Sequence, residues 1–435
     1  MSNPVSEKDF EGLIGPLGSF EVEPVVAVAV SGGRDSMALA FLVDRWVKSI
    51  GGRAVLLTVD HGLRAESHDE AQFVAEWAKG QGLECQVLRW QGEKPKSAIQ
   101  NAARAARYAL MEDWCRRHGI LHLFLAHHAD DQGETLLMRM ARGSGPAGLS
   151  AMAPVTETRH LRLLRPLLTV SRERLEDTLA AAGVDWVEDP SNQDPKYDRT
   201  LVRRLSVDLK KRGLEEGLLS ALTGDFASLR EKMDAEVVRF LGHYAVLHPA
   251  GYVTLPHPLI AGLDELYTAA ILGRVLRTVG GGDYAPGRDK LARLRARLAE
   301  PGFRSATLGR CRIMARRKKL IVLRESRNIP SPYPLAAGEE TVFDERFLLS
   351  APVDCRIAPL GLEGWKAIAD QSKDLLDGLP VVLRGSLPAF WDDLGLLAVP
   401  CLRYWRGGLE ENLIKRFQMS FRPPHPLCGI GVRLS

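Results

Sequence analysis

Short runs rich in apolar residues alternate with segments of helical spacing along the first third of the chain. The apolar runs, each expected to be a strand, lie at 25–30, 54–59, 85–90 and 121–126. Between them, the stretches with apolar residues three and four positions apart, typical of one helix face, are 37–43, 67–80 and 97–118. Alternating strands and helices predict a doubly wound, Rossmann-like α/β domain with a parallel sheet.

This alternation stops near residue 214, and the second half of the chain has a different pattern. Helical spacing predicts helices at 218–247, 263–279 and 288–298. Two short strands are expected at 311–314 and 320–323, and the Pro-rich segment 329–334 is typical of a linker. The final segment contains short strands and one helix. The pattern therefore predicts three domains, at 1–212, 213–329 (mainly helical) and 337–435 (small, α+β).

Composition is consistent with such a protein and excludes several classes. The chain has 435 residues, too many for one core, with 45% hydrophobic and 26% charged residues, as in soluble globular proteins. No apolar run reaches the roughly 18–20 residues of a membrane span, and the N-terminus lacks a signal-peptide pattern. Six scattered cysteines without a C-x-x-C pair argue against zinc ribbons, iron–sulfur sites and disulfides. We expect a cytoplasmic protein without a membrane partner. A net charge of +4 alone does not indicate nucleic acid.

The segment Ser31–Ser36 is the first candidate for chemistry. It joins the first strand to a helix, and its two glycines permit a tight turn in which the N–H groups of the helix N-terminus face an anion. An ordinary helix cap would use the same residue types. The segment lacks the Gly-Lys-Ser/Thr ending of a Walker A loop, and no G-x-G-x-x-G follows the strand.

Other polar residues follow the remaining strands, where ligands bind in open α/β sheets. Asp60-His61 and His127-His128 end two strands, and Asp131 and Glu134 lie three apart on the next helix, facing one way. These two carboxylates could hold Mg²⁺ or take a proton from an amine, or they could simply cap the helix. His127 could equally be a structural residue at the end of a strand.

Three basic groups could contact phosphates. Arg104 and Arg107 lie three apart on the helix at 97–118. Arg203 lies beyond the loop at 186–192, and Arg316, Arg317, Lys318 and Lys319 lie between the two short strands of the second half. Solvated surface positions would have the same pattern.

The motifs together resemble a known family. Ser-Gly-Gly-Arg-Asp-Ser after an apolar strand is similar to the pyrophosphate loop (PP-loop) of ATP pyrophosphatases, which split ATP into AMP and pyrophosphate. The further stretches that match are 59–64, 102–108, 126–134, 142–145, 164–168 and 186–192. With these stretches the chain resembles the tRNA(Ile)-lysidine synthetase family over almost its whole length.

The resemblance implies a two-step ligase reaction with ATP as co-substrate and Mg²⁺. The wobble cytidine of isoleucine tRNA with anticodon CAU is adenylated at its C2 oxygen, and the ε-amine of free lysine then displaces AMP to give lysidine. The implied nucleotide-binding residues are Ser31, Gly32, Gly33, Arg34, Asp35, Ser36, Asp60 and His61. The implied catalytic residues are Asp35, Arg107, His127, Asp131 and Glu134, with Asp35 also holding Mg²⁺.

The same resemblance implies roles for the domains. The first would be the catalytic PP-loop domain, and the other two would bind tRNA, with contacts from Arg203 and from the basic residues Arg316, Arg317, Lys318 and Lys319. The resemblance leaves open whether the protein forms a homodimer.

Three alternatives were weighed against this interpretation. A PP-loop tRNA thiolase needs paired cysteines, which this chain lacks. A PP-loop amidotransferase or small-molecule ligase would lack the basic second half and usually carries an ammonia source. A non-catalytic RNA-binding protein is disfavoured by the intact loop together with Asp35, Asp131 and Glu134.

Overall fold

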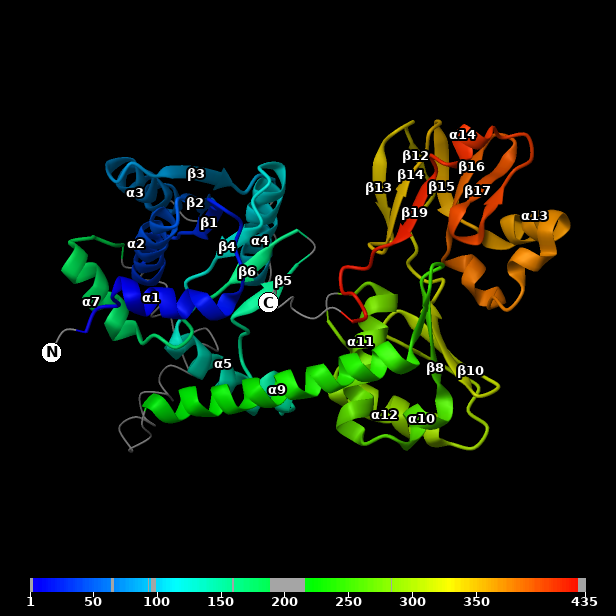
Figure 1. Cartoon of the computed structure of the whole chain (residues 1–435), viewed down its shortest axis with the longest axis horizontal. Coiled ribbons are helices and arrows are strands. Elements are labelled where there is room, and N and C mark those ends of the chain that lie inside the picture. Colours follow the sequence, from blue (N-terminus) through cyan, green and yellow to red (C-terminus); the bar gives the residue numbers. More distant parts are fainter. Residues whose placement is uncertain are drawn as a thin grey trace. The chain divides into compact units, whose positions relative to one another are not determined.

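The structure is a computed structural model that describes residues 3–63, 66–92, 94, 99–158, 160–187, 216–282 and 284–428. The chain forms two compact units, one reaching to Glu231 and the other beginning at Lys232 (Figure 1). Among the described residues, no helix has the length and apolar character needed to cross a bilayer.

The first unit is built on a six-stranded sheet with the strand order β3-β2-β1-β4-β6-β5. The strands are β1 (Val25–Ala29), β2 (Arg53–Asp60), β3 (Glu84–Arg89), β4 (His122–Phe124), β5 (Val155–Glu157) and β6 (Arg162–Leu164). All neighbouring strands pair in parallel except β5 and β6. The predicted doubly wound α/β fold is confirmed, and the antiparallel edge strand β5 is an addition to it.

Helices connect these strands and extend the unit. They are α1 (Glu7–Ile14), α2 (Arg34–Ser49), α3 (Glu66–Gly80), α4 (Ile99–Arg117), α5 (Ala129–Ala141), α6 (Pro146–Leu149) and α7 (Arg172–Ala182). Each helix predicted in this region is present. The predicted cap of α4 at Ser97 and the loop from 188 onward lie outside the described residues.

The central strands β1, β2 and β4 of this sheet are buried on both faces, as is typical of parallel sheets. Val26 and Val28 of β1 pack into one apolar core with α2, whereas Ala27 between them packs into a second core with α4. Successive side chains of a strand point to opposite faces, so one short strand supports both cores. The carboxyl end of β1 is therefore held from both sides.

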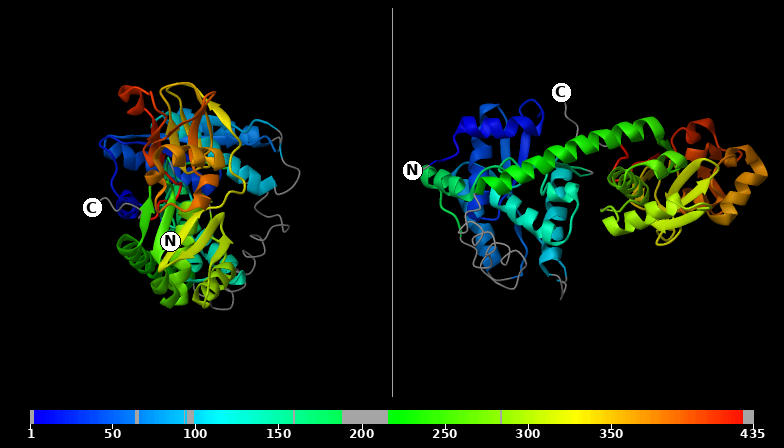
Figure 2. Two further views of the ribbon diagram at one scale, coloured as in Figure 1. Left: turned by 90° about the vertical axis from the view of Figure 1, so that its right-hand side faces the viewer. Right: turned by 90° about the horizontal axis from the view of Figure 1, so that it is seen from below.

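The long helix α9 (Glu216–Tyr244), drawn without interruption in Figures 1 and 2, contains the boundary between the units, with residues 216–231 in the first and 232–244 in the second. The first sheet of the second unit is antiparallel with the order β7-β8-β11-β10-β9. The elements are β7 (Val246–His248), β8 (Tyr252–Pro256), β9 (Ser305–Leu308), β10 (Cys311–Arg316), β11 (Lys319–Arg324), α10 (His257–Gly262), α11 (Glu265–Gly280) and α12 (Arg288–Ala299). The predicted helices and the β10–β11 hairpin are present, while β7, β8 and β9 were not predicted.

Two more antiparallel sheets complete this unit, with the orders β12-β15-β16-β17-β18 and β13-β14-β19. Their elements are β12 (Tyr333–Leu335), β13 (Glu340–Phe343), β14 (Phe347–Ser350), β15 (Cys355–Pro359), β16 (Pro388–Asp392), β17 (Gly395–Val399), β18 (Tyr404–Trp405), β19 (Gln418–Phe421), α13 (Gly361–Ser372) and α14 (Glu411–Ile414). The interpretation of 329–334 as a linker is wrong at its end, because Tyr333 pairs with Ile357 in the first of these sheets.

Candidate active site

The loop between β1 and α2 is closed by the Ser36 side chain. The Ser36 hydroxyl donates to the Gly33 carbonyl at 2.8 Å and accepts from the Ser31 N–H at 3.1 Å. Gly32 has φ +84°, a conformation that side chains disfavour, and a Cβ there would lie 3.4 Å from Val74 Cγ2. These constraints explain why the chain has glycine and serine at these positions.

The N-terminus of α2 has no capping side chain of its own, because the residue before the helix is Gly33. The first N–H groups of a helix have no partner within the helix, and the helix dipole makes this end positive. The loop therefore offers an anion backbone donors, and the Arg34 guanidinium, anchored by Glu176 at 2.6 Å, lies beside them.

Asp60 and His61 lie at the carboxyl end of β2, next to β1. Asp60 accepts hydrogen bonds from the Ser67 hydroxyl at 2.8 Å and the Gly62 N–H at 3.0 Å, and His68 Nδ1 is 3.5 Å away. Partial burial raises the pKa of Asp60, but the hydrogen bonds and His68 lower it by more, so the pKa is lowered overall. In this structure the Asp60 carboxylate orders the turn into α3.

The N-terminus of α5 carries the second group of predicted residues. His128 is the residue before the helix, and its backbone N–H donates to the Asp131 carboxylate at 3.2 Å. Asp131 thus has the capping role that the sequence left open. Glu134 is buried one turn further along the same side of the helix.

His128 forms the centre of an ionic cluster with three carboxylates, which we call the His128 cluster. Its Nε2 lies 3.4 Å from Asp35 and 3.6 Å from Asp131, and its Nδ1 lies 3.3 Å from Asp130. Burial lowers the pKa of His128, but the three carboxylates outweigh burial and raise it to about 10. The buried imidazole is therefore a cation at neutral pH, and it joins the phosphate loop to α5.

Asp35 is the loop residue within this cluster. Burial raises its pKa, but the hydrogen bond and charge of His128, with Arg34 and Arg172, outweigh burial, so the pKa is lowered overall. Asp35 is consequently ionised. Its Oδ1 is buried and accepts no hydrogen bond from the residues that the structure describes, with Arg34 Nε 3.7 Å away.

Three helix N-termini meet at this cluster. Asp35 lies in the first turn of α2, Asp130 and Asp131 in the first turn of α5, and the Arg172 N–H at the start of α7 donates to Asp130 at 3.2 Å. Three positive helix ends stabilise carboxylates here and also attract phosphate. The site can thus accommodate a polyanion beside ionised acids, which phosphoryl and nucleotidyl transfer requires.

The remaining predicted residues lie as follows. His127 is half-buried between β4 and α5, and Arg107 is on the exposed side of α4. Arg203 lies outside the described residues. In the second unit, Arg316 pairs with Lys319 across the β10–β11 hairpin, and Arg317 and Lys318 form its tip. Sequence reasoning missed the roles of His128, Asp130 and Arg172, whose contacts depend on side-chain direction and on distant segments.

Asp35 is the residue that fits a bound Mg²⁺. Mg²⁺ is usually held by one or two carboxylates together with substrate phosphates, and beside the phosphate loop Asp35 provides an ionised oxygen that accepts no hydrogen bond from any described residue. Within the described part of the chain, no three His, Cys, Asp or Glu side chains form a metal cage.

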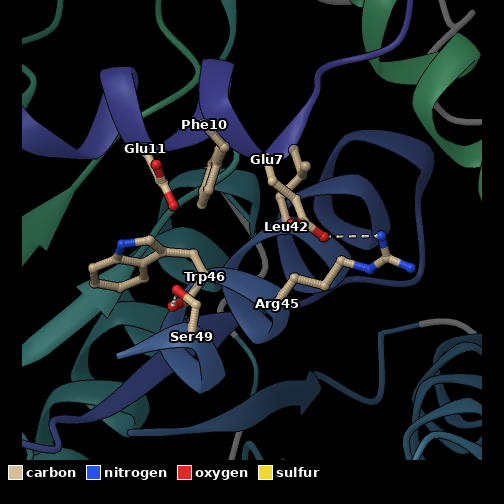
Figure 3. Close-up of a pocket in the computed structure, with 7 residues that line it drawn as sticks. All are labelled: Glu7, Phe10, Glu11, Leu42, Arg45, Trp46 and Ser49. Atoms are coloured by element: carbon tan, nitrogen blue, oxygen red, sulfur yellow. Dashed lines mark hydrogen bonds and ion pairs between the residues drawn. The ribbon is translucent and has the colours of Figure 1, made fainter. Parts of the chain in front are cut away.

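A small pocket elsewhere in the first unit is unrelated to this chemistry (Figure 3). It lies between α1 and the second half of α2, and Phe10, Leu42 and Trp46 form its apolar part. The phosphate loop is at the opposite end of α2, and no predicted site residue lines the pocket.

Comparison with known proteins agrees with this geometry. The family model described as a PP-loop domain matches residues 3–208, which defines the class of the first unit. Three similar proteins carry the name tRNA(Ile)-lysidine synthase. That from Ruegeria pomeroyi is 36% identical, over 89% of this chain and 90% of the relative. That from Wolbachia pipientis is 34% identical, over 87% and 89%. That from a Bradyrhizobium species is 46% identical, over 50% and 61%.

The chain belongs to the tRNA(Ile)-lysidine synthase family. Two of these relatives are covered over about nine-tenths of their length, so the similarity includes both units and not only the PP-loop domain. The resemblance inferred from the sequence motifs is confirmed, and so is the predicted class of enzyme, a ligase that uses a PP-loop.

Proposed function

We propose that this protein joins free lysine to C2 of the wobble cytidine in isoleucine tRNA with a CAU anticodon. In the first step the C2 oxygen attacks the α-phosphorus of ATP, and pyrophosphate leaves. In the second step the lysine ε-amine attacks C2, the C2–O bond breaks, and AMP leaves. The observation that supports this most directly is the His128 cluster, which links Asp35 of the phosphate loop to Asp131 of α5.

Each of the two steps depends on specific residues. The N-terminus of α2 and Arg34 would bind the phosphates that leave as pyrophosphate. Asp35 would hold Mg²⁺, which when bound neutralises phosphate charge. Lysine reacts as the neutral amine, so a carboxylate or His127 must accept its proton, and Asp131 and Glu134 lie on one side of α5 to attract the ammonium form. Arg107 would contact the nucleotide or the base.

The central test supplies purified protein with ATP, radiolabelled lysine and CAU-anticodon isoleucine tRNA. We expect release of pyrophosphate and incorporation of one lysine per tRNA. Methionine tRNA, which shares the CAU anticodon, is the control for identity. Absence of incorporation, or equal incorporation into methionine tRNA, would overturn the proposed function.

A second test concerns Asp35. Asp35→Asn should lower pyrophosphate release by about 100-fold or more, because a charge that acts on the leaving phosphates is lost. The dissociation constant for tRNA should change by no more than about threefold, since tRNA binding depends on many phosphate contacts. Asp113→Asn on α4, which removes an exposed carboxylate paired with Arg116 and Arg117, is the matched control. A large loss of tRNA binding would show that Asp35 is structural.

A further inference from the structure

A tyrosine hydroxyl on α4 lies between two guanidinium groups. Arg104 Nη2 donates to the Tyr108 hydroxyl at 3.4 Å, and the Arg104 guanidinium lies over the tyrosine ring, 5.3 Å from its centroid. Burial lowers the pKa of the Arg165 guanidinium, and Tyr108 and Arg104 also act on it, so the three side chains lie close together. Arg104 is exposed, Tyr108 is half-buried and Arg165 is buried. The three residues thus form a layered cluster that reaches the surface.

Arg165 is a buried cation without an anion beside it. Its side chain is 9% exposed, and Nη1 donates to the Ala153 carbonyl and the Thr156 hydroxyl, both at 2.9 Å. Its Nε is buried without a hydrogen bond, and no carboxylate in the described part of the chain pairs with it. All its partners are neutral, so the cluster carries uncompensated positive charge. Burying such a charge is costly unless an anion approaches.

The hydrogen-bonding capacity of Tyr108 points in the same direction. A guanidinium can only donate, so the tyrosine oxygen accepts from Arg104. The hydroxyl proton remains to be donated, and no residue that the structure describes accepts it. A donor held between two cations is suited to an anionic oxygen, and phosphate is the anion that arginine fits best.

The cluster lies at the carboxyl end of the strands of the sheet, which is the end that carries the active site. Arg165 directly follows β6, whose Leu164 pairs with Phe124 of β4, and Phe124 pairs with Val28 of β1. The phosphate loop, His127-His128 and Arg165 therefore follow three adjacent strands at the same end of the sheet, and α4 shares an apolar core with Leu123 of β4 and Leu163 of β6. Two strand spacings separate β1 from β6, about 10 Å.

We propose that Arg104, Tyr108 and Arg165 form an anion subsite that binds a backbone phosphate of the substrate tRNA near the nucleotide that is modified. This rests on the proposed function. The ATP phosphates occupy the N-terminus of α2, and the RNA strand brings further phosphates past that point along the same edge. Arg104 and Tyr108 contact the phosphate, whereas Arg165 is a positioning residue that orients the Tyr108 hydroxyl from below.

The test uses the full-length protein and compares steady-state constants for tRNA and for ATP. Tyr108→Phe removes only the hydroxyl, and Arg104→Gln removes the exposed charge. Each should raise the KM for tRNA about tenfold, the effect of losing a hydrogen bond to a charged group, and leave the KM for ATP within about twofold. Arg104→Gln should also reduce the salt dependence of tRNA binding by about 0.7 in log–log slope, and Arg104→Lys should restore that slope.

Controls separate this proposal from loss of the fold and from failure of the proposed function. Arg116→Gln removes an exposed arginine from the same helix that is paired with Asp113, and it should leave both KM values unchanged. The wild-type protein must incorporate lysine, because its failure to do so would concern the proposed function instead. An unchanged KM for tRNA in both variants would overturn the subsite, and so would a rise in the KM for ATP alone, which would assign the cluster to the nucleotide.

Discussion

His128 carries a buried positive charge whose effect on stability depends on pH. Burial lowers its pKa, but Asp130, Asp35 and Asp131 raise it to about 10, whereas in the unfolded chain it is near 6.5. A group whose pKa is raised on folding contributes its full stabilisation at pH values below its pKa in the unfolded chain. That stabilisation is lost as the pH rises from about 6.5 to about 10.

Removing this charge should therefore destabilise the first unit most at mildly acidic pH. We expect His128→Gln to lower the free energy of unfolding by about 3–5 kcal/mol near pH 6, because carboxylates stay buried without their cation. The difference from wild type should shrink toward about pH 10. Urea unfolding in EDTA at a series of pH values measures both the loss of stability near pH 6 and its decrease toward pH 10. His68→Gln, at an exposed ion pair with Asp60, should have almost no effect. A difference that does not vary with pH would contradict the charge assignment.

Sequence reasoning reached Asp35, Asp131 and Glu134 but not the residue that connects them. His127 and His128 are neighbours after the same strand, and only the fold determines which imidazole is buried. Asp130 depends on the Arg172 N–H, 42 residues away in the chain. Motifs specify which residue types the chemistry needs, whereas a buried contact between distant segments leaves no local pattern.

At the scale of the elements, helix α5 is held in register by one buried glutamine. Gln132 Nε2 donates to the Met152 carbonyl at 2.9 Å, and the Met152 N–H donates to Gln132 Oε1 at 2.7 Å. Two turns further along, Arg139 Nη1 donates to the carbonyls of Gly148 and Ala151. These contacts fix the helix that carries Asp131.

Gln132→Leu should damage both stability and activity. The change leaves both backbone groups of Met152 without their partners, which should cost about 2–3 kcal/mol in the free energy of unfolding. A shift of α5 would also misplace Asp131, so lysine incorporation should fall by about tenfold or more at temperatures where the variant is folded. Gln72→Leu on α3, whose glutamine bonds the exposed Glu76, is the matched control. Lost stability with full activity would show that α5 keeps its position without Gln132.

The elements that the sequence predicted are those with a sustained pattern. The buried strands β1 and β2 and the amphipathic helices α2 and α3 have five or more residues of consistent spacing. Strands β5, β6 and β7 have three residues each and no longer apolar run around them, unlike β4, whose three residues lie within the apolar run 121–126. They form because a neighbouring strand offers hydrogen-bond partners, which is a property of the fold.

At the scale of the whole molecule, the two domains predicted for the second half are joined by a buried ionic group. Asp344 accepts from Arg324 Nε at 3.0 Å and from Arg346 Nε at 2.9 Å, and all three side chains are buried. Arg324 belongs to β11 of the first sheet, while Asp344 and Arg346 flank the β13–β14 turn. The β7–β8 turn also lies close to β14, since a Cβ at Gly251 would be 2.8 Å from Phe347 Cζ.

This arrangement predicts that the sheets on either side of residue 330 unfold together. In Asp344→Asn, two buried guanidinium groups lose their carboxylate, which should cost about 3–5 kcal/mol. Hydrogen exchange on the full-length protein should then show faster exchange in β10 and β11 and, to the same extent, in β14 and β19. Asp393→Asn, at an exposed aspartate of the same unit, should leave all four strands protected. Loss of protection confined to β14 and β19 would mean that 213–329 and 337–435 are independent domains, since the second would then unfold while the first stays folded.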